Sequence, residues 1–494
     1  MRVLVIGAGV IGLSIARVLS MYNGLDIIVV EREPDVGWGA SKANTSIIHP
    51  GHEEDPDLHP LRAKLCVEGN KLWRKWVEEL DIPSKWPGEL MVFTNSDEEK
   101  EALRYVDLAK SNNVPGVRVL YGDELRRLEP SVSPSAIGAV YAPSAGLISP
   151  PEAVIALAEN LVENNGRILV HTEVNRVVVK NGSVEGVETN RGFIEADIVV
   201  NAAGIYADKI SHSAGVELDF KIKPRKGEYV IFDEDTPVKP TRILHTTPTK
   251  ITKGVYAITT VGGELLIGPS AVDLPYESKE DTSTTPEGIE FVLKEAGRLL
   301  REVPPRAQAI RTYAGLRPES PGGQWLIKAY EEPWGFVNVA GIRSPGLTAA
   351  PAIAYYVRDL ISKTFEVNLE PKSNWKPYRK GITRLREKTL EEIDELIKVN
   401  SDYGEVLCNC KMVSKAEVIE AVERIKAIGA RVTLDGVKFR TGAMTGRCQG
   451  SFCRLRIAKL IAEHEGIGIH EVIVKRGSYG LGDIKMLLKE GVQA

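Results

Sequence analysis

The chain has 494 residues, of which 43% are hydrophobic and 26% are charged, and its length predicts about three domains at roughly 150 residues each. Its net charge of −4 excludes a global field that would attract nucleic acid or anionic lipid. No run of 18 apolar residues occurs, so we expect no transmembrane segment. A strand that begins at Arg2 leaves no room for a signal peptide.

The first unit of the chain reads V-L-V-I-G-A-G-V-I-G at residues 3–12. We expect a buried strand, a helix from Val10 to about residue 22, and a second parallel strand at 25–31. In that context the pattern G-x-G-x-x-G indicates a dinucleotide site. Gly7 permits the tight turn, Gly9 lets the backbone approach a pyrophosphate, and Gly12 lets the helix pack on the strand.

Glu31 ends the second strand, where a carboxylate can accept both ribose hydroxyls of a nucleotide. Its charge repels a 2′-phosphate, which disfavours NADP. NAD and FAD are both compatible with the glycine turn. The small, polar segment 37–51 that follows suits a long cofactor whose second half extends past the first unit, and this favours FAD.

Further along the chain the elements alternate between helices and strands. Amphipathic segments at 61–80 and 98–112 predict helices, and another helix begins at Pro151. We then expect a strand at 167–174, a hairpin with its turn at Asn181-Gly182, and a strand ending in N-A-A-G at 201–204.

The residue pattern changes after residue 220. Up to residue 324, short segments in which apolar and polar residues alternate predict an antiparallel sheet beside the nucleotide domain. Segment 336–362 predicts a strand, a glycine turn and a helix that return to the nucleotide domain. The charged and proline-containing segment 366–400 predicts a linker with a surface helix, and the cysteine region begins near Ser401.

Four of the five cysteines fall in one C-terminal stretch, as Cys408-x-Cys410 and Cys448-x4-Cys453. Ser414 and Glu417 form a capping box for the helix after the first pair. The second pair lies near the start of a helix at 456–464, whose positive end favours thiolate. Four soft ligands select zinc or iron–sulfur, and C-x-C spacing is unusual for zinc. The fifth, Cys66, is expected in a core.

Residues 1–365 resemble the D-amino-acid-oxidase-like superfamily of FAD-dependent oxidoreductases. The resemblance rests on S-I-I-H-P-G around His49, N-A-A-G-I-Y-A-D at 201–208, and A-G-I-R-S-P-G-L-T at 340–348. It implies an α/β fold, in which a Rossmann-like FAD-binding domain carries an inserted antiparallel β-sheet substrate domain. It also implies flavin contacts at Gly7, Gly9, Ile11, Gly12, Glu31, Arg32, Ser41, Thr45, Ser46, Val174, Ala203, Gly204, Gly341, Gly346, Leu347 and Thr348.

The tail 408–477 resembles the bacterioferritin-associated-ferredoxin-like domain, including T-G-x-x-x-G-R-C-Q-G. This implies a small helical domain that holds a [2Fe–2S] cluster through its four cysteines. Both parts in this order, with R-T-Y-A-G-L-R-P at 311–318, resemble catalytic subunits of anaerobic glycerol-3-phosphate dehydrogenases. That family carries G-G-K where this chain reads G-I-R at 341–343. L-2-hydroxyglutarate oxidases share the N-terminal half, including K-G-E-Y at 226–229.

The resemblance implies a dehydrogenase that oxidises sn-glycerol 3-phosphate to dihydroxyacetone phosphate, with hydride passing to flavin and electrons leaving through the cluster. His49 is the predicted base, because imidazole titrates near working pH. We expect Arg317 to grip the anionic substrate bidentately, and Lys226 to be a solvated surface residue. Further candidate contacts to the same anion are Arg311, Tyr313 and Arg343.

Other functions remain compatible with the sequence. A dehydrogenase for L-2-hydroxyglutarate or another 2-hydroxy acid, and one for proline or glycine derivatives, keep the same fold. A cluster-carrying scaffold, in which the flavin regulates, belongs to a different class. A tRNA-modifying flavoenzyme is a third class, but no basic, aromatic-rich patch supports it.

The expected partners are an electron-acceptor protein or quinone-linked subunits in a hetero-oligomer, with no nucleic acid. Clustered cysteines without a secretory signal indicate the cytoplasm, and docking at a membrane through partner subunits is left open. The expected division is FAD-binding domain 1–90, 146–218 and 331–365, substrate domain 91–145 and 219–330, linker 366–400, and [2Fe–2S] domain with tail 401–494.

Overall fold

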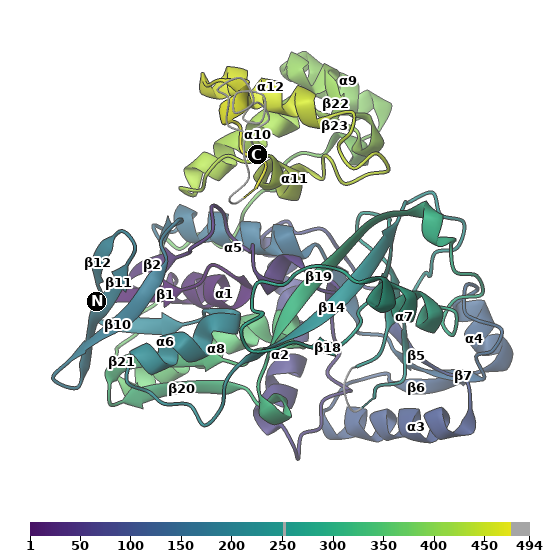
Figure 1. The fold of residues 1–494 in the computed structure, drawn as a ribbon, viewed down its shortest axis with the longest axis horizontal. Helices are drawn as coiled ribbons and strands as arrows, with labels where there is room; N and C mark the ends of the chain where they lie inside the picture. The colour runs from purple at the N-terminus through teal and green to yellow at the C-terminus, as the bar shows by residue number, and fades with distance from the viewer. Residues whose placement is uncertain (250–252, 476–494) are drawn as a thin grey trace, which may run out of the picture.

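The computed structural model describes residues 1–249 and 253–475, in which two large sheets are joined by helices and a small helical unit lies above them (Figure 1). The first sheet has the order β10-β11-β21-β13-β1-β2-β9, and its middle strands β21 to β9 run parallel. Its strands are β1 (Arg2–Ile6), β2 (Asp26–Val30), β9 (Arg167–Leu169), β10 (Val174–Lys180), β11 (Ser183–Thr189), β12 (Gly192–Glu195), β13 (Ile198–Asn201), β20 (Leu326–Glu331) and β21 (Trp334–Ala340).

Helices cover both faces of this sheet because its strands are apolar on both sides. In β1, Val3 and Val5 pack into one core while Leu4 and Ile6 pack into another, as the period of two requires. The first core includes residues of α1 (Val10–Leu19), α2 (Pro60–Glu79), α5 (Pro150–Glu163) and α8 (Gly346–Thr364), and the second includes those of α6 (Ala207–Ser213).

The predicted units of this half are confirmed with small shifts. The helix after the glycine turn ends at Leu19 rather than near residue 22, and the strand expected at 167–174 is limited to β9. The hairpin turn is confirmed, since Asn181 and Gly182 have φ values of 50° and 78°. The predicted helix at 61–80 is α2, in which Cys66 is fully buried.

The second large sheet has the order β18-β14-β17-β16-β15-β5-β7-β6, with β19 paired to β14. It is antiparallel as expected except between β15 and β5, which are parallel. Its elements are β5 (Glu89–Phe93), β6 (Arg118–Tyr121), β7 (Gly138–Ala142), β14 (Lys223–Phe232), β15 (Ile243–Thr246), β16 (Tyr256–Thr259), β17 (Leu265–Gly268), β18 (Val272–Asp273) and β19 (Ala309–Glu319), with α3 (Ser96–Ser111), α4 (Gly122–Leu128) and α7 (Pro286–Ala296).

A short three-stranded sheet joins the two halves, in the order β3 (Ile47–Ile48), β8 (Gly146–Ile148) and β4 (Ser84–Lys85). Two of the domain limits expected above fall inside strands. The limit after residue 90 cuts β5, and the limit after 330 cuts β20, which pairs with β21 of the first sheet. The division itself stays a prediction.

The C-terminal unit lies above both sheets (Figure 1) and has its own apolar core. It is tied to the body by buried ion pairs, such as Arg440 Nη1 to Asp35 Oδ2 at 2.6 Å and Lys411 Nζ to Glu264 Oε1 at 2.5 Å. The expected tail beyond residue 475 lies outside the described residues. Its elements are α9 (Leu390–Val399), β22 (Val406–Cys408), β23 (Val413–Ser414), α10 (Lys415–Ala427), α11 (Leu434–Thr441) and α12 (Arg454–Glu465).

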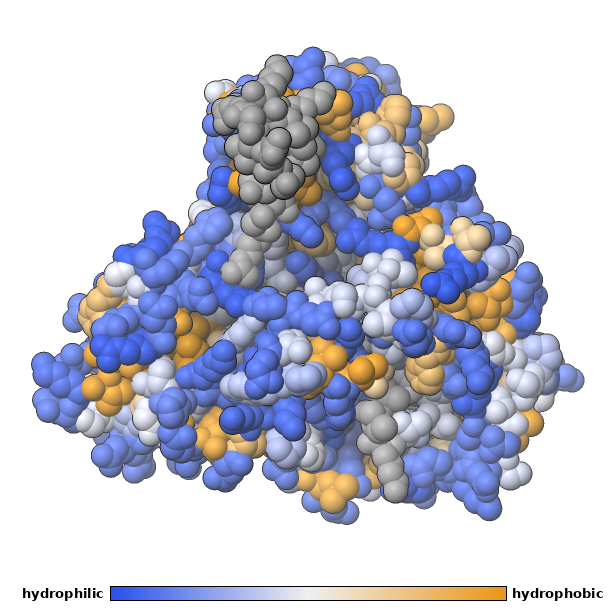
Figure 2. All heavy atoms as spheres, viewed as in Figure 1, coloured by the Kyte–Doolittle hydropathy of each residue, from blue (hydrophilic) through white to orange (hydrophobic). Residues whose placement is uncertain are grey.

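Across the described ranges, no helix has the length and apolar composition needed to cross a bilayer. On the face shown in Figure 2, apolar residues form small patches separated by polar ones.

Candidate functional site

The glycine turn between β1 and α1 requires its glycines for space. A Cβ on Gly7 would lie 2.6 Å from the carbonyl oxygen of Ala202, and Gly7 has a φ of +103°. A Cβ on Gly12 would lie 2.0 Å from the carbonyl oxygen of Gly7, so only glycine lets α1 pack this closely. Gly9 is the N-cap of α1, and the N–H of Val10 donates to Ser41 Oγ at 3.0 Å. The N-terminus of a helix favours a bound phosphate.

Glu31 follows β2 directly and is held in place by backbone groups. The N–H of Ala8 donates to Oε2 at 2.8 Å, and the N–H of Glu33 donates to Oε1 at 3.0 Å. Burial raises the pKa of the Glu31 carboxyl, while these two donors lower it. These two hydrogen bonds hold the Glu31 carboxylate in one orientation.

A cavity of about 1610 Å³ extends from the glycine turn to the N-terminus of α8. This exceeds the roughly 300–1,000 Å³ of most small-molecule pockets and suits an extended ligand with a substrate beside it. It is lined by every predicted flavin contact except Gly12 and Gly341, which instead allow close packing. The lining predicted residues include Ile11, Arg32, Ser41, Thr45, Ser46, Val174, Ala203, Gly204, Gly346, Leu347 and Thr348.

The loop before α2 and the start of α8 meet at the inner end of this cavity. The backbone N–H of His49 donates to Thr348 Oγ1 at 2.9 Å, and Trp73 Nε1 donates to the carbonyl oxygen of Leu347 at 2.8 Å. Asn70 Nδ2 also donates to the carbonyl oxygen of His49 at 3.1 Å. Main-chain bonds thus position His49, whose imidazole remains available.

The His49 side chain lines the cavity and is 5% exposed. Its Nδ1 has no hydrogen-bond partner among the described residues and lies 4.0 Å from Glu53 Oε2. Burial, aided by the charge of Lys253, lowers the pKa of His49 to about 3. The imidazole is therefore neutral at physiological pH, as a proton acceptor must be, but its pKa lies well below the value near working pH on which the prediction of His49 as base was based.

Several cationic side chains face the cavity near this histidine. Arg317 Nη2 donates to the carbonyl oxygen of Ser270 at 3.2 Å, and Arg343 Nε lies 3.3 Å from Glu319 Oε1. Burial lowers the pKa of Arg343. Sequence reasoning missed Arg225 and Lys253, which also line the cavity, because neither lies in a motif.

Two predicted contacts to the anion, Tyr313 and Arg311, line the cavity but also bond to other groups, and Lys226 differs from its prediction. The hydroxyl of Tyr313 donates to the carbonyl oxygen of Asn44 at 3.0 Å, so it supports the flavin loop. Arg311 is exposed, and its Nη1 donates to Gln449 Oε1 at 3.4 Å. The expectation of a solvated Lys226 was wrong: it is 3% exposed, and its ammonium lies 3.3 Å from Asp281 because β14 is covered there.

The four C-terminal cysteines converge in two pairs of sulfurs. Cys410 Sγ lies 3.7 Å from Cys448 Sγ, and Cys408 hydrogen-bonds to Cys453, which caps α12. One tetrahedral zinc with bonds of about 2.3 Å would place all four sulfurs about 3.8 Å apart. No three of them lie within 4.8 Å of one another among the described residues. The pairing therefore fits two irons, each with two thiolates, better than one zinc.

The surroundings of the cysteines affect the four thiols differently. A backbone hydrogen bond from Phe452 is the main cause that lowers the pKa of the Cys448 thiol. The hydrogen bond between Cys408 and Cys453 lowers the pKa of the Cys408 thiol to about 6 and raises that of Cys453. A Cβ on Gly446 would lie 2.5 Å from Cys410 Cβ, so a larger residue would crowd the site. The capping box of Ser414 and Glu417 is confirmed and fixes the start of α10.

The cysteine site adjoins the large cavity. Arg311, which lines the cavity, contacts Gln449 in the loop between Cys448 and Cys453. Lys411 follows Cys410, lines the cavity, and pairs with Glu264 of the second sheet. The large cavity and the cysteine site are therefore connected by direct side-chain contacts.

The fold and the site define a dinucleotide-binding oxidoreductase with an attached iron–sulfur centre. Residues 2–360 match the FAD dependent oxidoreductase family, and residues 406–463 match the BFD-like [2Fe-2S] binding domain. The first match covers more than half of the chain, so the chain belongs to the family of FAD-dependent oxidoreductases. Its cofactors are FAD and a [2Fe–2S] cluster.

Similar proteins cover nearly the whole chain. It is 38% identical over 470 residues to a glycerol 3-phosphate dehydrogenase of Caloramator mitchellensis, with 95% of each chain covered. It is 26% identical to anaerobic glycerol-3-phosphate dehydrogenase subunit A1 of Haloferax volcanii, over 93% of this chain and 82% of that one. The structure of L-alpha-glycerophosphate oxidase from Mycoplasma pneumoniae with FAD bound matches with a TM-score of 0.70 at 28% identity, covering 76% of this chain and 98% of that chain.

We expect Glu31→Ala to weaken FAD binding, because the ribose loses its acceptor while Ala8 and Glu33 lose their shared partner. Loss of charged hydrogen bonds of about 1.5–3 kcal/mol predicts a roughly 10- to 100-fold higher Kd. The measurement is flavin release at increasing dilution, followed by fluorescence. Glu188→Ala, which removes an exposed carboxylate on β11, is the control and should bind FAD normally. An unchanged Kd in Glu31→Ala would contradict the ribose assignment.

Proposed function

We propose that this chain oxidises sn-glycerol 3-phosphate to dihydroxyacetone phosphate and passes the electrons through its [2Fe–2S] cluster to an external acceptor. One observation carries the proposal: a neutral, buried His49 shares the cavity with Arg317, Arg343 and Lys253. A base beside a group of cations suits a substrate that has both a hydroxyl and a phosphate. The relatives named as glycerol 3-phosphate dehydrogenases support this choice.

His49 accepts the proton of the secondary hydroxyl. As that O–H bond breaks, the neighbouring C–H bond gives up its hydrogen with both electrons, and the C–O bond becomes a carbonyl. FAD, when bound, supplies the hydride acceptor. The imidazole is neutral before the reaction because burial lowers its pKa, so no other group has to deprotonate it first.

The cationic residues bind and orient the phosphate. Arg317 is half-buried on β19, and its guanidinium can form paired hydrogen bonds to phosphate oxygens. Arg343 replaces the lysine of the related dehydrogenases and is held by Glu319 at 3.3 Å. The planar guanidinium of arginine donates two parallel hydrogen bonds, whereas the ammonium of lysine is a compact charge, so the two side chains do not bind phosphate with the same geometry.

The substrate class is tested by mixing the oxygen-free holoenzyme with each candidate and following flavin absorbance. Glycerol 3-phosphate should bleach the flavin fastest, ahead of L-2-hydroxyglutarate, proline and glycine. Bleaching by L-2-hydroxyglutarate but not by glycerol 3-phosphate would replace the proposed substrate with the 2-hydroxy acid. Bleaching by none of them would remove the proposed function.

The electron acceptor follows from the one-electron character of the cluster, which cannot store the pair taken from one substrate. We propose a hetero-oligomer in which an electron-acceptor protein or quinone-linked subunits oxidise the cluster. The naming of one relative as a subunit supports this arrangement. Purification of the chain with its native neighbours, followed by assay with a quinone, tests it. Quinone reduction by the isolated chain at the full rate would contradict it.

We expect Arg317→Ala to raise the KM for glycerol 3-phosphate about 10- to 100-fold, since a charge-assisted bidentate contact contributes about 1.5–3 kcal/mol. A contact made equally in the ground and transition states leaves kcat within a few-fold. The control is Arg176→Ala on β10, whose exposed side chain pairs with Glu188 at 2.5 Å. Steady-state kinetics measure both constants, and an unchanged KM would show that Arg317 does not bind the phosphate.

A further inference from the structure

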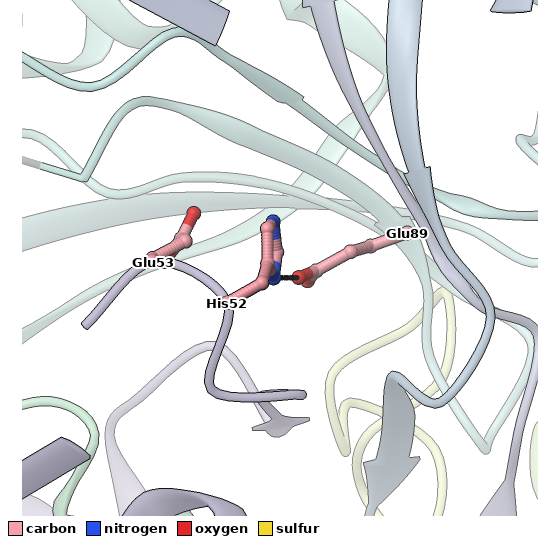
Figure 3. A group of neighbouring side chains, drawn as sticks. All are labelled: His52, Glu53 and Glu89. Atoms are coloured by element: carbon pink, nitrogen blue, oxygen red, sulfur yellow. Dashed lines mark ion pairs between the residues drawn. The ribbon is translucent and has the colours of Figure 1, made fainter. Parts of the chain in front are cut away.

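A buried cluster of titratable side chains lies behind His49 and has no part in the function proposed above. His52 and Glu53 come from the loop between β3 and α2, and Glu89 is the first residue of β5 (Figure 3). His52 and Glu89 are 0% exposed, and the Glu53 side chain is 3% exposed. Figure 3 shows Glu89 reaching toward the His52 ring from the opposite side to Glu53.

The polar atoms of this cluster lack hydrogen bonds. Among the described residues, both ring nitrogens of His52 and all four carboxylate oxygens of Glu53 and Glu89 have no hydrogen-bond partner. A buried carboxylate without donors is costly, so a proton or a cation must compensate it.

The nearby cations do not resolve this charge. Lys253 lies 3.2 Å from Glu53 Oε2, but it also pairs with Glu54. Arg62 pairs with Glu54 at 2.5 Å. Within the described part of the chain, no Lys or Arg pairs with Glu89, whose ion-pair partner is His52. The charge of Glu89 therefore remains to be compensated.

The spacing of the atoms fits a metal ion. His52, Glu53 and Glu89 each offer a ligand atom, and these atoms lie within 4.8 Å of one another. His52 Nδ1 and Glu89 Oε1 are 3.4 Å apart. Two ligands about 2.1 Å from one tetrahedral ion lie about 3.4 Å apart. The same separation is long for a hydrogen bond, which is normally about 2.7–3.2 Å.

A second histidine lies on the other side of Glu53. His245 Nε2 is 3.8 Å from Glu53 Oε1, is buried and has no hydrogen-bond partner among the described residues, but it lies outside the group of three whose ligand atoms are within 4.8 Å of one another. An imidazole beside two carboxylates favours zinc, manganese or iron over magnesium or calcium. The other carboxylate–histidine group, formed by Glu423, His464 and Glu465, is exposed, and its members already pair with each other or with Lys426.

We propose that His52, Glu53 and Glu89 bind one divalent transition-metal ion. The ion holds Glu53 in place, and Glu53 Oε2 lies 4.0 Å from His49 Nδ1, so the metal site is directly behind the proposed base. It is separate from the cysteine site and does not depend on the identity of the substrate.

The test is a metal count on the full-length holoprotein after incubation with Zn²⁺ or Mn²⁺ and removal of free ions. Two irons per chain are assigned to the cluster, and every other metal is counted. We expect about one further ion per chain. Absorption fine structure at the zinc edge should show nitrogen and oxygen at about 2.0–2.2 Å, whereas cysteine-bound zinc shows sulfur at about 2.3 Å. A wild-type protein without a further ion, or with sulfur-ligated zinc only, overturns the proposal in favour of a protonated Glu89.

Two variants and one control locate the ion. Glu89→Gln keeps the shape of the side chain, and His52→Ala removes the ring; each should reduce the further metal at least tenfold while flavin and cluster content stay normal. His464→Ala, in the exposed group, should keep the ion. Retention of the ion by a correctly folded Glu89→Gln protein also overturns the proposal. None of these measurements uses substrate, so their outcome is independent of the proposed dehydrogenase activity.

Discussion

We expect His49→Ala to slow the reduction of flavin by glycerol 3-phosphate about 10²- to 10⁴-fold, the usual contribution of a positioned general base. FAD content should stay normal, because His49 is tied to Thr348 and Asn70 through its main chain rather than its ring. Anaerobic stopped-flow absorbance at saturating substrate measures the rate constant directly. This variant separates proton acceptance from cofactor binding.

The control for this variant is His212→Ala, whose exposed ring pairs with Glu217 and is not among the residues that line the cavity. It should reduce flavin at the wild-type rate. A His49→Ala protein that reduces its flavin normally would assign the proton to another group. Loss of FAD from that variant would instead show that the ring supports the cofactor.

Cys448→Ser should abolish the cluster absorbance and leave the reduction of flavin by substrate within about twofold of wild type. Hydroxyl is a poor ligand for iron–sulfur clusters, which are held by thiolates. Turnover with an external one-electron acceptor should fall by about 10²-fold or more, because the cluster no longer carries electrons from the flavin to the acceptor. A loss of this size is typical when one component of a catalytic unit is removed. Iron analysis, stopped-flow absorbance and steady-state assays measure the three quantities.

Ser451→Ala is the matched control, since Ser451 lies in the same loop and its hydroxyl donates to the carbonyl oxygen of Cys448 at 2.7 Å. It should keep the cluster and all activities. If Cys448→Ser loses flavin reduction as well, the C-terminal unit is required for the structure of the cavity. Contacts such as Arg311 to Gln449 and Lys411 to Glu264 make that outcome informative.

The local elements of the fold could be predicted because short-range forces determine them. The glycine turn needs the space and the positive φ that Gly7 provides, whatever lies around it. The Asn181-Gly182 turn and the Ser414–Glu417 capping box depend on residues within a few positions of each other. These features were predicted correctly for that reason.

Errors arose where distant segments meet. The antiparallel sheet contains one parallel pair, in which β15 pairs with β5 from a segment about 150 residues earlier, and no local pattern shows the direction of such a pairing. Lys226 lies on a strand whose outer side is covered by the segment that carries Asp281, and a strand pattern cannot show that cover. The domain limits stay predictions, since two of them cut strands of sheets formed by residues far apart.

The residues of the candidate site also fall into those that a local motif predicts and those that only the tertiary structure brings together. Motifs indicated Glu31, His49, Arg317 and the four cysteines, because each lies in a short pattern with a chemical meaning. The cations Arg225 and Lys253 lie in no motif, and they reach the cavity only through the second sheet. The buried group of His52, Glu53 and Glu89 likewise lies in no motif, because its members come from the loop before α2 and from the start of β5.

The sequence by itself determined the nucleotide turn, the four thiolate ligands and the resemblance to FAD-dependent oxidoreductases, because local spacing and residue chemistry carry that information. The tertiary structure alone decided the pairing of the sulfurs, the charge around His49, and the buried histidine–carboxylate cluster behind it. These depend on distances between side chains from separate strands and loops. Such distances follow from sheet register and helix packing, which no single segment of the chain specifies.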